Sequence, residues 1–86
     1  MTSFRYSVSI MPRAGILDPQ GRAVEAALPQ LGATSVHGVR VGRRVELSVE
    51  AEQEHEARSV VERLASDFLA NPLVEDWHIQ ATEAGA

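Results

Sequence analysis

The three histidines are the first candidates for chemistry, because imidazole can bind a metal and can move a proton near neutral pH. They are His37, His55 and His78. They fall in different predicted elements, form no i, i+4 pair and have no acidic residue beside them at a metal-ligand spacing. The chain has no cysteine, and it contains no Gly-x-Ser-x-Gly motif and no phosphate-binding loop. The sequence therefore predicts no catalytic residue, no cofactor site and no metal site in this chain.

Charged residues gather in two places, one acidic and one basic. Alternate positions from 50 to 56 are glutamates, which could pair as general acid and base but are more typical of a solvated helix start. Three arginines, Arg40, Arg43 and Arg44, surround Gly42. Guanidinium groups bind carboxylates and phosphates bidentately and are common at protein interfaces. We expect these arginines either to keep a loop solvated or to contact acidic groups of a partner.

The stretch from Gly15 to Val24 reads GILDPQGRAV, and it suggests either an anion site or a helix start. The first N–H groups of a helix lack internal partners and can bind an anion. Asp18 is a good N-cap, and Pro19 suits the first helical position. Because the capping carboxylate would occupy the N–H groups that an anion needs, we predict a helix cap here.

Apolar spacing then predicts the elements that must position these residues. Residues 4–10 alternate between apolar and polar, as in a strand with one buried face, and Pro12 ends it. Residues 19–31 have helical spacing, with Gly32 suited to the left-handed residue after the end and Pro29 expected to bend or shorten the last turn. Residues 36–41 and 45–49 predict two strands joined as a hairpin around Gly42.

A second helix and a last strand follow. The helix begins in the acidic run and carries an apolar stripe from Ala57 to Leu69, until Asn71-Pro72 stops it. Residues 74–81 predict the final strand, in which Trp77 is equally suited to the core and to an interface rim.

The order βαββαβ predicts an α+β fold, a single ferredoxin-like open-faced sandwich with a four-stranded antiparallel sheet and two helices on one face. We expect one domain over residues 1–86, with 81–86 as a frayed tail. The other face of the sheet would then be exposed. Its expected residues are Arg5, Ser7, Ser9, Met11, Glu46, Ser48 and Glu50.

Composition narrows the possible partners. With 86 residues the domain is small and its core marginal, which favours a homo-oligomer. A net charge of −4 is the wrong sign for a protein that neutralises nucleic-acid phosphates. The absence of cysteine and of a long apolar run suits a cytoplasmic protein without a membrane segment.

Three motifs together resemble one family over almost the whole chain. They read LDPQG followed by Ala23-Val24 and Ala27-Leu28, then VRVG leading into Val45-Glu46-Leu47, then LANPLVED over 69–76. They are similar to the small PurS subunit of phosphoribosylformylglycinamidine synthase, the FGAM synthase of purine biosynthesis. Pro29 departs from the pattern expected in that helix. The motif positions Asp18, Pro19, Gly21, Arg40, Gly42, Asn71 and Asp76, together with Arg43 and Trp77, are proposed as structural or interface residues.

The resemblance implies a non-catalytic adaptor in an ATP- and glutamine-dependent ligase. Its implied partners are a second copy, as dimer or tetramer, the synthetase subunit PurL and the glutaminase subunit PurQ. The adaptor would help these subunits dock and would shelter the ammonia that passes between them, while ATP and Mg are used by the synthetase. An alternative with the same element order is an ACT-like regulatory domain that binds amino acids, although fold alone does not give function.

Overall fold

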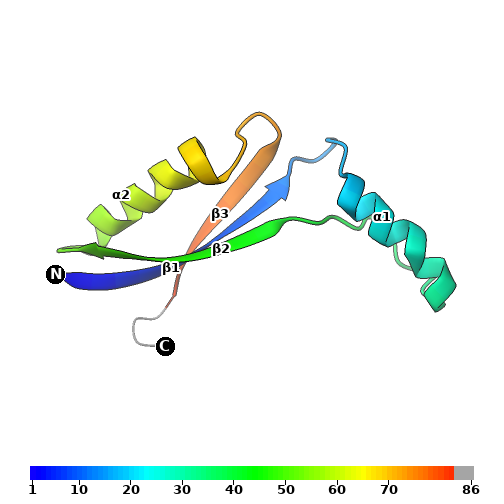
Figure 1. Ribbon diagram of the computed structural model, residues 1–86, viewed down its shortest axis with the longest axis horizontal. Helices are drawn as coiled ribbons and strands as arrows, with labels where there is room; N and C mark the ends of the chain where they lie inside the picture. The colour runs from blue at the N-terminus through cyan, green and yellow to red at the C-terminus, as the bar shows by residue number, and fades with distance from the viewer. Residues whose placement is uncertain (83–86) are drawn as a thin grey trace.

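The computed structural model describes residues 1–82, which form a three-stranded sheet, two helices and two short helical extensions (Figure 1). Within these residues, no helix is both long enough and apolar enough to cross a bilayer. In chain order the elements are β1 (Thr2–Pro12), α1 (Pro19–Ala27), a 3₁₀ turn (Leu28–Leu31), β2 (Arg43–Ala51), α2 (Glu54–Leu64), a π-helical turn (Ala65–Leu69) and β3 (Glu75–Thr82).

The sheet is antiparallel in the order β2-β1-β3, so the first strand is central. Its register places Val8 opposite Val45 on one side and Ile79 on the other. Because directly opposed residues in a sheet point to the same face, all three strands present their apolar alternation together. The predicted strands at 4–10, 45–49 and 74–81 are thus confirmed, each with slightly different ends.

The core lies between this apolar face and α2. The largest fully buried side chains are Tyr6, Val8, Ile10 and Val61. Ala57 and Ala65 flank Val61 at helical spacing and are also buried. Small side chains on the inner face of α2 allow the helix backbone to approach the sheet closely, so the bulky residues of β1 fill the space between the layers.

Tyr6 adds a polar contact to this core. Its hydroxyl donates to the Glu54 carboxylate, with 2.6 Å between Oη and Oε2. Burial and the hydrogen bond to Glu54 raise the pKa of Tyr6 to about 12. The bond joins the central strand to the first turn of α2, where Gln53 and Glu56 form a reciprocal cap.

The opposite face of the sheet is polar and mostly exposed, as the sequence predicted. Two of the expected residues differ: Ser7 has only 3% of its surface exposed, and Met11 is half-buried. Ser7 sits on the central strand between Glu46 and Gln80. The longer neighbours on both outer strands leave a short serine side chain little access to water.

The predicted strand at 36–41 is not formed, so the expected hairpin around Gly42 is wrong and the described sheet has three strands instead of four. The reason is the destination of its backbone hydrogen bonds. The N–H of Val39 donates to Glu25, and the N–H of Val41 donates to Asp18. Two carboxylates from the region of α1 therefore take the donors that a neighbouring strand would have used.

The placement of α1 also differs from the expectation of two helices on one face. Only α2 covers the sheet, whereas α1, cyan in Figure 1, lies beyond one end of it. We call residues 13–42, which contain α1, the arm. The chain measures 52 × 30 × 13 Å, and its radius of gyration is 16.6 Å, against about 12 Å for a compact domain of this length.

The ends of α1 follow the local sequence signals. Pro29 shortens the helix as predicted, since regular α-helix ends at Ala27 and a 3₁₀ turn continues to Leu31. Gly32 then takes the left-handed conformation, with φ of 81°. At the other end of the chain, residues 81 and 82 belong to β3 and are not frayed, while the rest of the predicted tail lies outside the described residues.

Replacing Tyr6 by Phe tests the contact between the strand and the helix. Tyr6→Phe keeps the ring and removes the hydroxyl, so we expect the free energy of unfolding to fall by about 1.5 kcal/mol, as for a hydrogen bond to a charged group. Urea unfolding at pH 7 measures it. Glu54→Gln retains an acceptor and should cost less. Equal stability of Tyr6→Phe and the wild type would mean that the bond contributes nothing.

Candidate functional site

Four of the residues singled out from the sequence line one groove between the end of the sheet and the arm. They are Asp18, Pro19, Gly42 and Arg43, and Glu75 joins them. The groove has a volume of about 610 Å³. Residues from β1, the arm, β2 and β3 meet there, so it is the place where the arm is attached to the rest of the molecule. We call it the junction groove.

Asp18 caps α1 and also binds the segment of the arm that leads back to the sheet. Its Oδ1 accepts from the N–H of Gly21 at 3.0 Å, and its Oδ2 accepts from the N–H of Val41 at 2.9 Å. These two hydrogen bonds, to Gly21 first and then to Val41, hold the pKa of the Asp18 carboxyl below its usual value. The predicted cap is confirmed, and the second contact is one that local sequence could not reveal.

Glu25 repeats this arrangement one segment further along. Its Oε2 accepts from the N–H of Val39 at 3.1 Å. Alternate residues of an extended segment direct their N–H groups to the same side, so Val39 and Val41 both face α1. The segment from 39 to 41 is thus fastened along the helix by two carboxylates.

Two glycines are required by close approach at this junction. A Cβ on Gly21 would overlap the Asp18 carboxylate and the carbonyl oxygen of Val39. A Cβ on Gly42 would overlap the carbonyl oxygen of Ile10 and the sulfur of Met11. Gly21 lets the returning segment lie against α1, and Gly42 lets it pass against the end of β1.

Arg43 and Glu75 form the second fastening of the groove. The two side chains pair bidentately, at 2.7 Å from Nη1 to Oε2 and 3.0 Å from Nη2 to Oε1. Nη2 of Arg43 also donates to the carbonyl of Leu69. The pair raises the pKa of Arg43, and Arg43, followed by the N–H of Asn71, lowers the pKa of Glu75. Arg43 is therefore a residue that ties β2 to β3 and to the end of the π-helical turn that follows α2.

Asn71 orders the loop that leads into β3. Its N–H donates to Oε1 of Glu75 at 2.7 Å, and its side-chain oxygen accepts from the N–H of Leu73 at 3.1 Å. An asparagine that bonds the backbone two residues on is typical of a tight turn. The role supported for Asn71 by these contacts is structural.

Arg13 is a junction residue that sequence reasoning missed. Its Nη2 donates to the carbonyl of Pro72 at 2.6 Å, and its Nε lies 3.3 Å from the carboxylate of Asp76. Asp76 is thereby placed in an exposed ion pair at the base of the arm. Arg13 and its partners are about sixty residues apart, so no local spacing could have signalled their contact.

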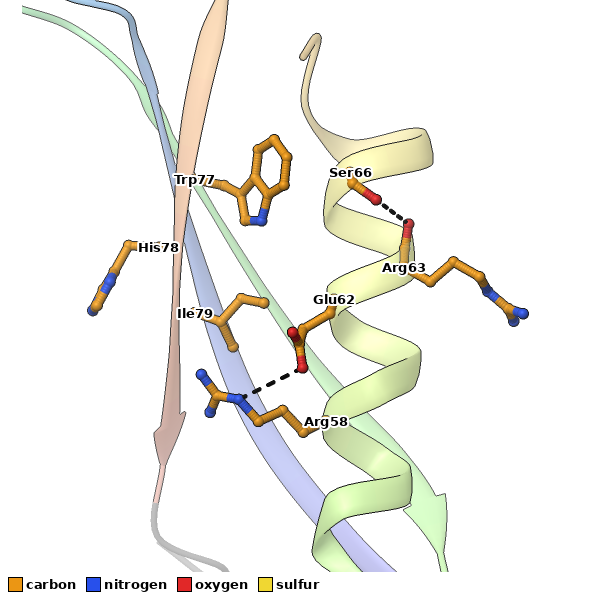
Figure 2. Close-up of a pocket in the computed structure, with 7 residues that line it drawn as sticks. All are labelled: Arg58, Glu62, Arg63, Ser66, Trp77, His78 and Ile79. Carbon is orange, nitrogen blue, oxygen red and sulfur yellow. Dashed lines mark hydrogen bonds and ion pairs between the residues drawn. The ribbon is translucent and has the colours of Figure 1, made fainter.

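Arg40 and Trp77 lie outside the junction groove. Arg40 is exposed and lines a neighbouring hollow of the arm, together with Arg22 and Glu25. Trp77 lines a separate groove of about 510 Å³ between α2 and β3, together with His78 and Ile79 of β3, Arg58, Glu62 and Arg63 of α2, and Ser66 of the π-helical turn (Figure 2). We call this second hollow the α2–β3 groove. Trp77 is half-buried there, between the core and rim positions that the sequence left open.

The charged side chains at the junction either accept hydrogen bonds from backbone N–H groups or form an ion pair. Asp18, Glu25, Arg43 and Glu75 each have a defined partner in the fold. In the part of the chain from 1 to 82, no three potential metal ligands come together. The arrangement is suited to presenting a shaped surface, with the arm held at a fixed place relative to the sheet.

Known proteins are similar to this chain in sequence over nearly its whole length. The family model described as "PurS: Phosphoribosylformylglycinamidine (FGAM) synthase" matches residues 5–83. The phosphoribosylformylglycinamidine synthase subunit PurS of Mycobacterium leprae is 43% identical over 75 residues, covering 87% of this chain and 91% of that protein. The subunit of the same name from Bacillus subtilis is 30% identical over 83 residues, covering 96% and 98%.

Solved structures show the same fold. A chain in the structure of PurLQS from Thermotoga maritima superposes with a TM-score of 0.87 at 28% identity, covering 95% of this chain and 100% of that one. PurS from Thermus thermophilus superposes with a TM-score of 0.77 at 35% identity, covering 95% and 100%. Neither these structures nor the relatives above are ACT domains, so they favour the first of the two functions expected from the sequence.

Acid should weaken the junction, because two of its hydrogen bonds depend on ionised carboxylates. A carboxyl whose pKa is lower in the folded state stabilises the fold above its ordinary pKa, 3.8 for Asp18 and 4.5 for Glu75, and this stability is lost as the pH falls through the lower folded values. We expect the free energy of unfolding to decline below about pH 4.5. Urea unfolding from pH 7 to pH 3 measures the decline. The double variant Asp18→Asn, Glu75→Gln should decline less steeply, and an identical slope would contradict this assignment.

Gly42→Ala should destabilise the protein because the added methyl meets backbone. We expect a loss of about 1–3 kcal/mol in the free energy of unfolding, the usual cost of overpacking. Thermal unfolding followed by circular dichroism measures it. Combining it with Met11→Ala removes the flexible neighbour and leaves the Ile10 carbonyl in place. Full recovery in that double variant would show that the backbone contact is not the limiting one.

Proposed function

The chain belongs to the PurS family of phosphoribosylformylglycinamidine synthase, and on this premise we propose that it is a non-catalytic adaptor subunit of that ligase. The observation that most directly supports this proposal is the superposition of nearly the whole chain on a chain of PurLQS from Thermotoga maritima. The complete synthase converts formylglycinamide ribonucleotide, ATP and glutamine to FGAM. In this proposal the chain bridges the synthetase subunit PurL and the glutaminase subunit PurQ.

Sheltered ammonia transfer gives the bridge a chemical purpose. Ammonia released from glutamine into water near neutral pH becomes protonated, and ammonium has no lone pair with which to attack an amide carbonyl. An adaptor that holds the glutaminase beside the synthetase shortens the path of the free base and keeps water out of it. ATP and Mg act in the synthetase subunit, and this chain supplies docking surfaces.

Three further proposals concern the extent of the domain, the self-association of the chain and its location in the cell. We propose that residues 1–86 form one domain, that the chain associates with itself as a dimer or tetramer, and that it works in the cytoplasm, where purine synthesis supplies its partners. Self-association is supported by the elongated shape of the chain, which leaves apolar residues of the arm uncovered. No partner is proposed among nucleic acids or membranes, in keeping with the net charge of −4.

Reconstitution tests the adaptor role. The synthetase and glutaminase subunits are mixed with and without this chain, and FGAM formation is measured with glutamine as the nitrogen donor. We expect omission of the chain to lower the glutamine-dependent rate by about a hundredfold, the lower range of what colocalisation contributes.

The control replaces glutamine by a high concentration of an ammonium salt. Because free ammonia then reaches the synthetase without a bridge, we expect this rate to depend little on the chain. Equal glutamine-dependent rates with and without the chain would overturn the adaptor role. A loss of both rates together would point instead to a part in the synthetase reaction itself.

A further inference from the structure

The arm is the basic part of an acidic chain. Residues 13–42 contain three arginines and two acidic residues, whereas the rest of the chain contains five arginines and ten acidic residues. The two acids of the arm, Asp18 and Glu25, are half-buried, and their carboxylates accept hydrogen bonds from backbone N–H groups. The charged side chains that the arm exposes are therefore all arginines.

These arginines meet at one hollow on the arm. Arg13 comes from the start of the arm, Arg22 from α1 and Arg40 from the segment that leads back to the sheet. All three line a hollow of about 550 Å³, which we call the arm hollow, and Asp18 and Glu25 line it as well. The sequence placed Arg40 in a cluster with Arg43 and Arg44, but the fold groups it with two arginines that are distant in the chain.

Two of the three guanidinium groups have no direct partner in the fold. Arg13 is engaged with the loop before β3. Within residues 1–82, the side chains of Arg22 and Arg40 form no hydrogen bond and no ion pair. The lowered pKa of Asp18 owes most to its two hydrogen bonds from backbone N–H groups and less to the charge of Arg40. Arg22 and Arg40 can thus accept carboxylates from outside the chain.

Arg22 and the apolar side chain of Val24 face opposite sides of α1. Each residue turns an α-helix by about 100°, so residues two positions apart point about 200° away from each other. Arg22 lines the arm hollow, whereas Val24 is 44% exposed and does not line it. The arm hollow and the apolar side of α1 can therefore be occupied at the same time by different partners.

We propose that the arm hollow binds an acidic segment of a partner protein, with carboxylates of that segment paired to Arg22 and Arg40. Guanidinium groups pair with carboxylates bidentately, and arginine is enriched at protein interfaces. Ile16 and Leu17 line the same hollow and are 42% and 67% exposed. They add apolar surface against which a protein segment can pack. The inference rests on the adaptor role proposed above, since the partner is the synthetase or the glutaminase subunit.

Reconstitution at limiting concentrations of this chain tests the arm hollow. The measured quantity is the concentration of the chain that gives half of the maximal glutamine-dependent rate of FGAM formation at low ionic strength. We expect this concentration to rise about tenfold in the double variant Arg22→Ala, Arg40→Ala, because two charged pairs at the interface are lost. Raising the ionic strength should weaken the wild type more than the variant, since salt screens exposed pairs.

The matched control removes two exposed arginines from the rest of the molecule. Arg44→Ala, Arg63→Ala changes the net charge by the same amount, and we expect it to leave the half-saturating concentration within about twofold of the wild type. An equal rise in this control would show an effect of net charge alone and would overturn the proposal. An unchanged value in Arg22→Ala, Arg40→Ala would overturn it as well.

Sedimentation of the same variants distinguishes the occupant of the hollow. Weaker self-association of Arg22→Ala, Arg40→Ala would place the acidic run of a second copy, residues 50–56, in the hollow, and would overturn the assignment to a different protein. We expect unchanged self-association and an unchanged circular dichroism spectrum. A wild-type chain that fails to raise the glutamine-dependent rate would contradict the adaptor role itself, so the two failures have separate readouts.

Discussion

The arm depends on one carboxylate that serves two backbone donors. Asp18 accepts hydrogen bonds from the N–H of Gly21, at the start of α1, and from the N–H of Val41, which is 23 residues after Asp18 in the chain. One carboxylate therefore joins the segment that enters the arm to the segment that leaves it. Charged acceptors form stronger hydrogen bonds to N–H groups than a neutral strand carbonyl does. This explains why a valine-rich segment with strand-like composition lies along α1, and why the sheet ends one strand short.

The second constraint fixes the direction of the arm. The bidentate Arg43–Glu75 pair joins the two outer strands at the end where the arm leaves, and Asn71 and Arg13 attach the loop before β3 to the same corner. Gly42 permits the close passage between them. In this arrangement α1 lies away from the sheet face that it would cover in a compact sandwich, and the apolar residues Val24 and Leu31 of the arm are exposed.

A molecule built in this way is suited to assembly more than to chemistry. Its ionic groups at the junction are engaged with backbone or with each other, and its exposed surfaces include apolar residues of the arm and the α2–β3 groove. Membership of the PurS family gives these surfaces a context in a multi-subunit ligase.

Local sequence determined the elements whose signals are short in range. The alternation of β1, β2 and β3, the Asp18-Pro19 cap, the break at Pro29 and the left-handed Gly32 all follow from residues within a few positions of one another. Tertiary structure alone decided what the segment from 36 to 41 pairs with, since strand composition specifies a need for hydrogen-bond partners and not their identity. The contacts of Asp18 with Val41, of Arg43 with Glu75 and of Arg13 with Pro72 join distant residues, and only the folded chain brings them together.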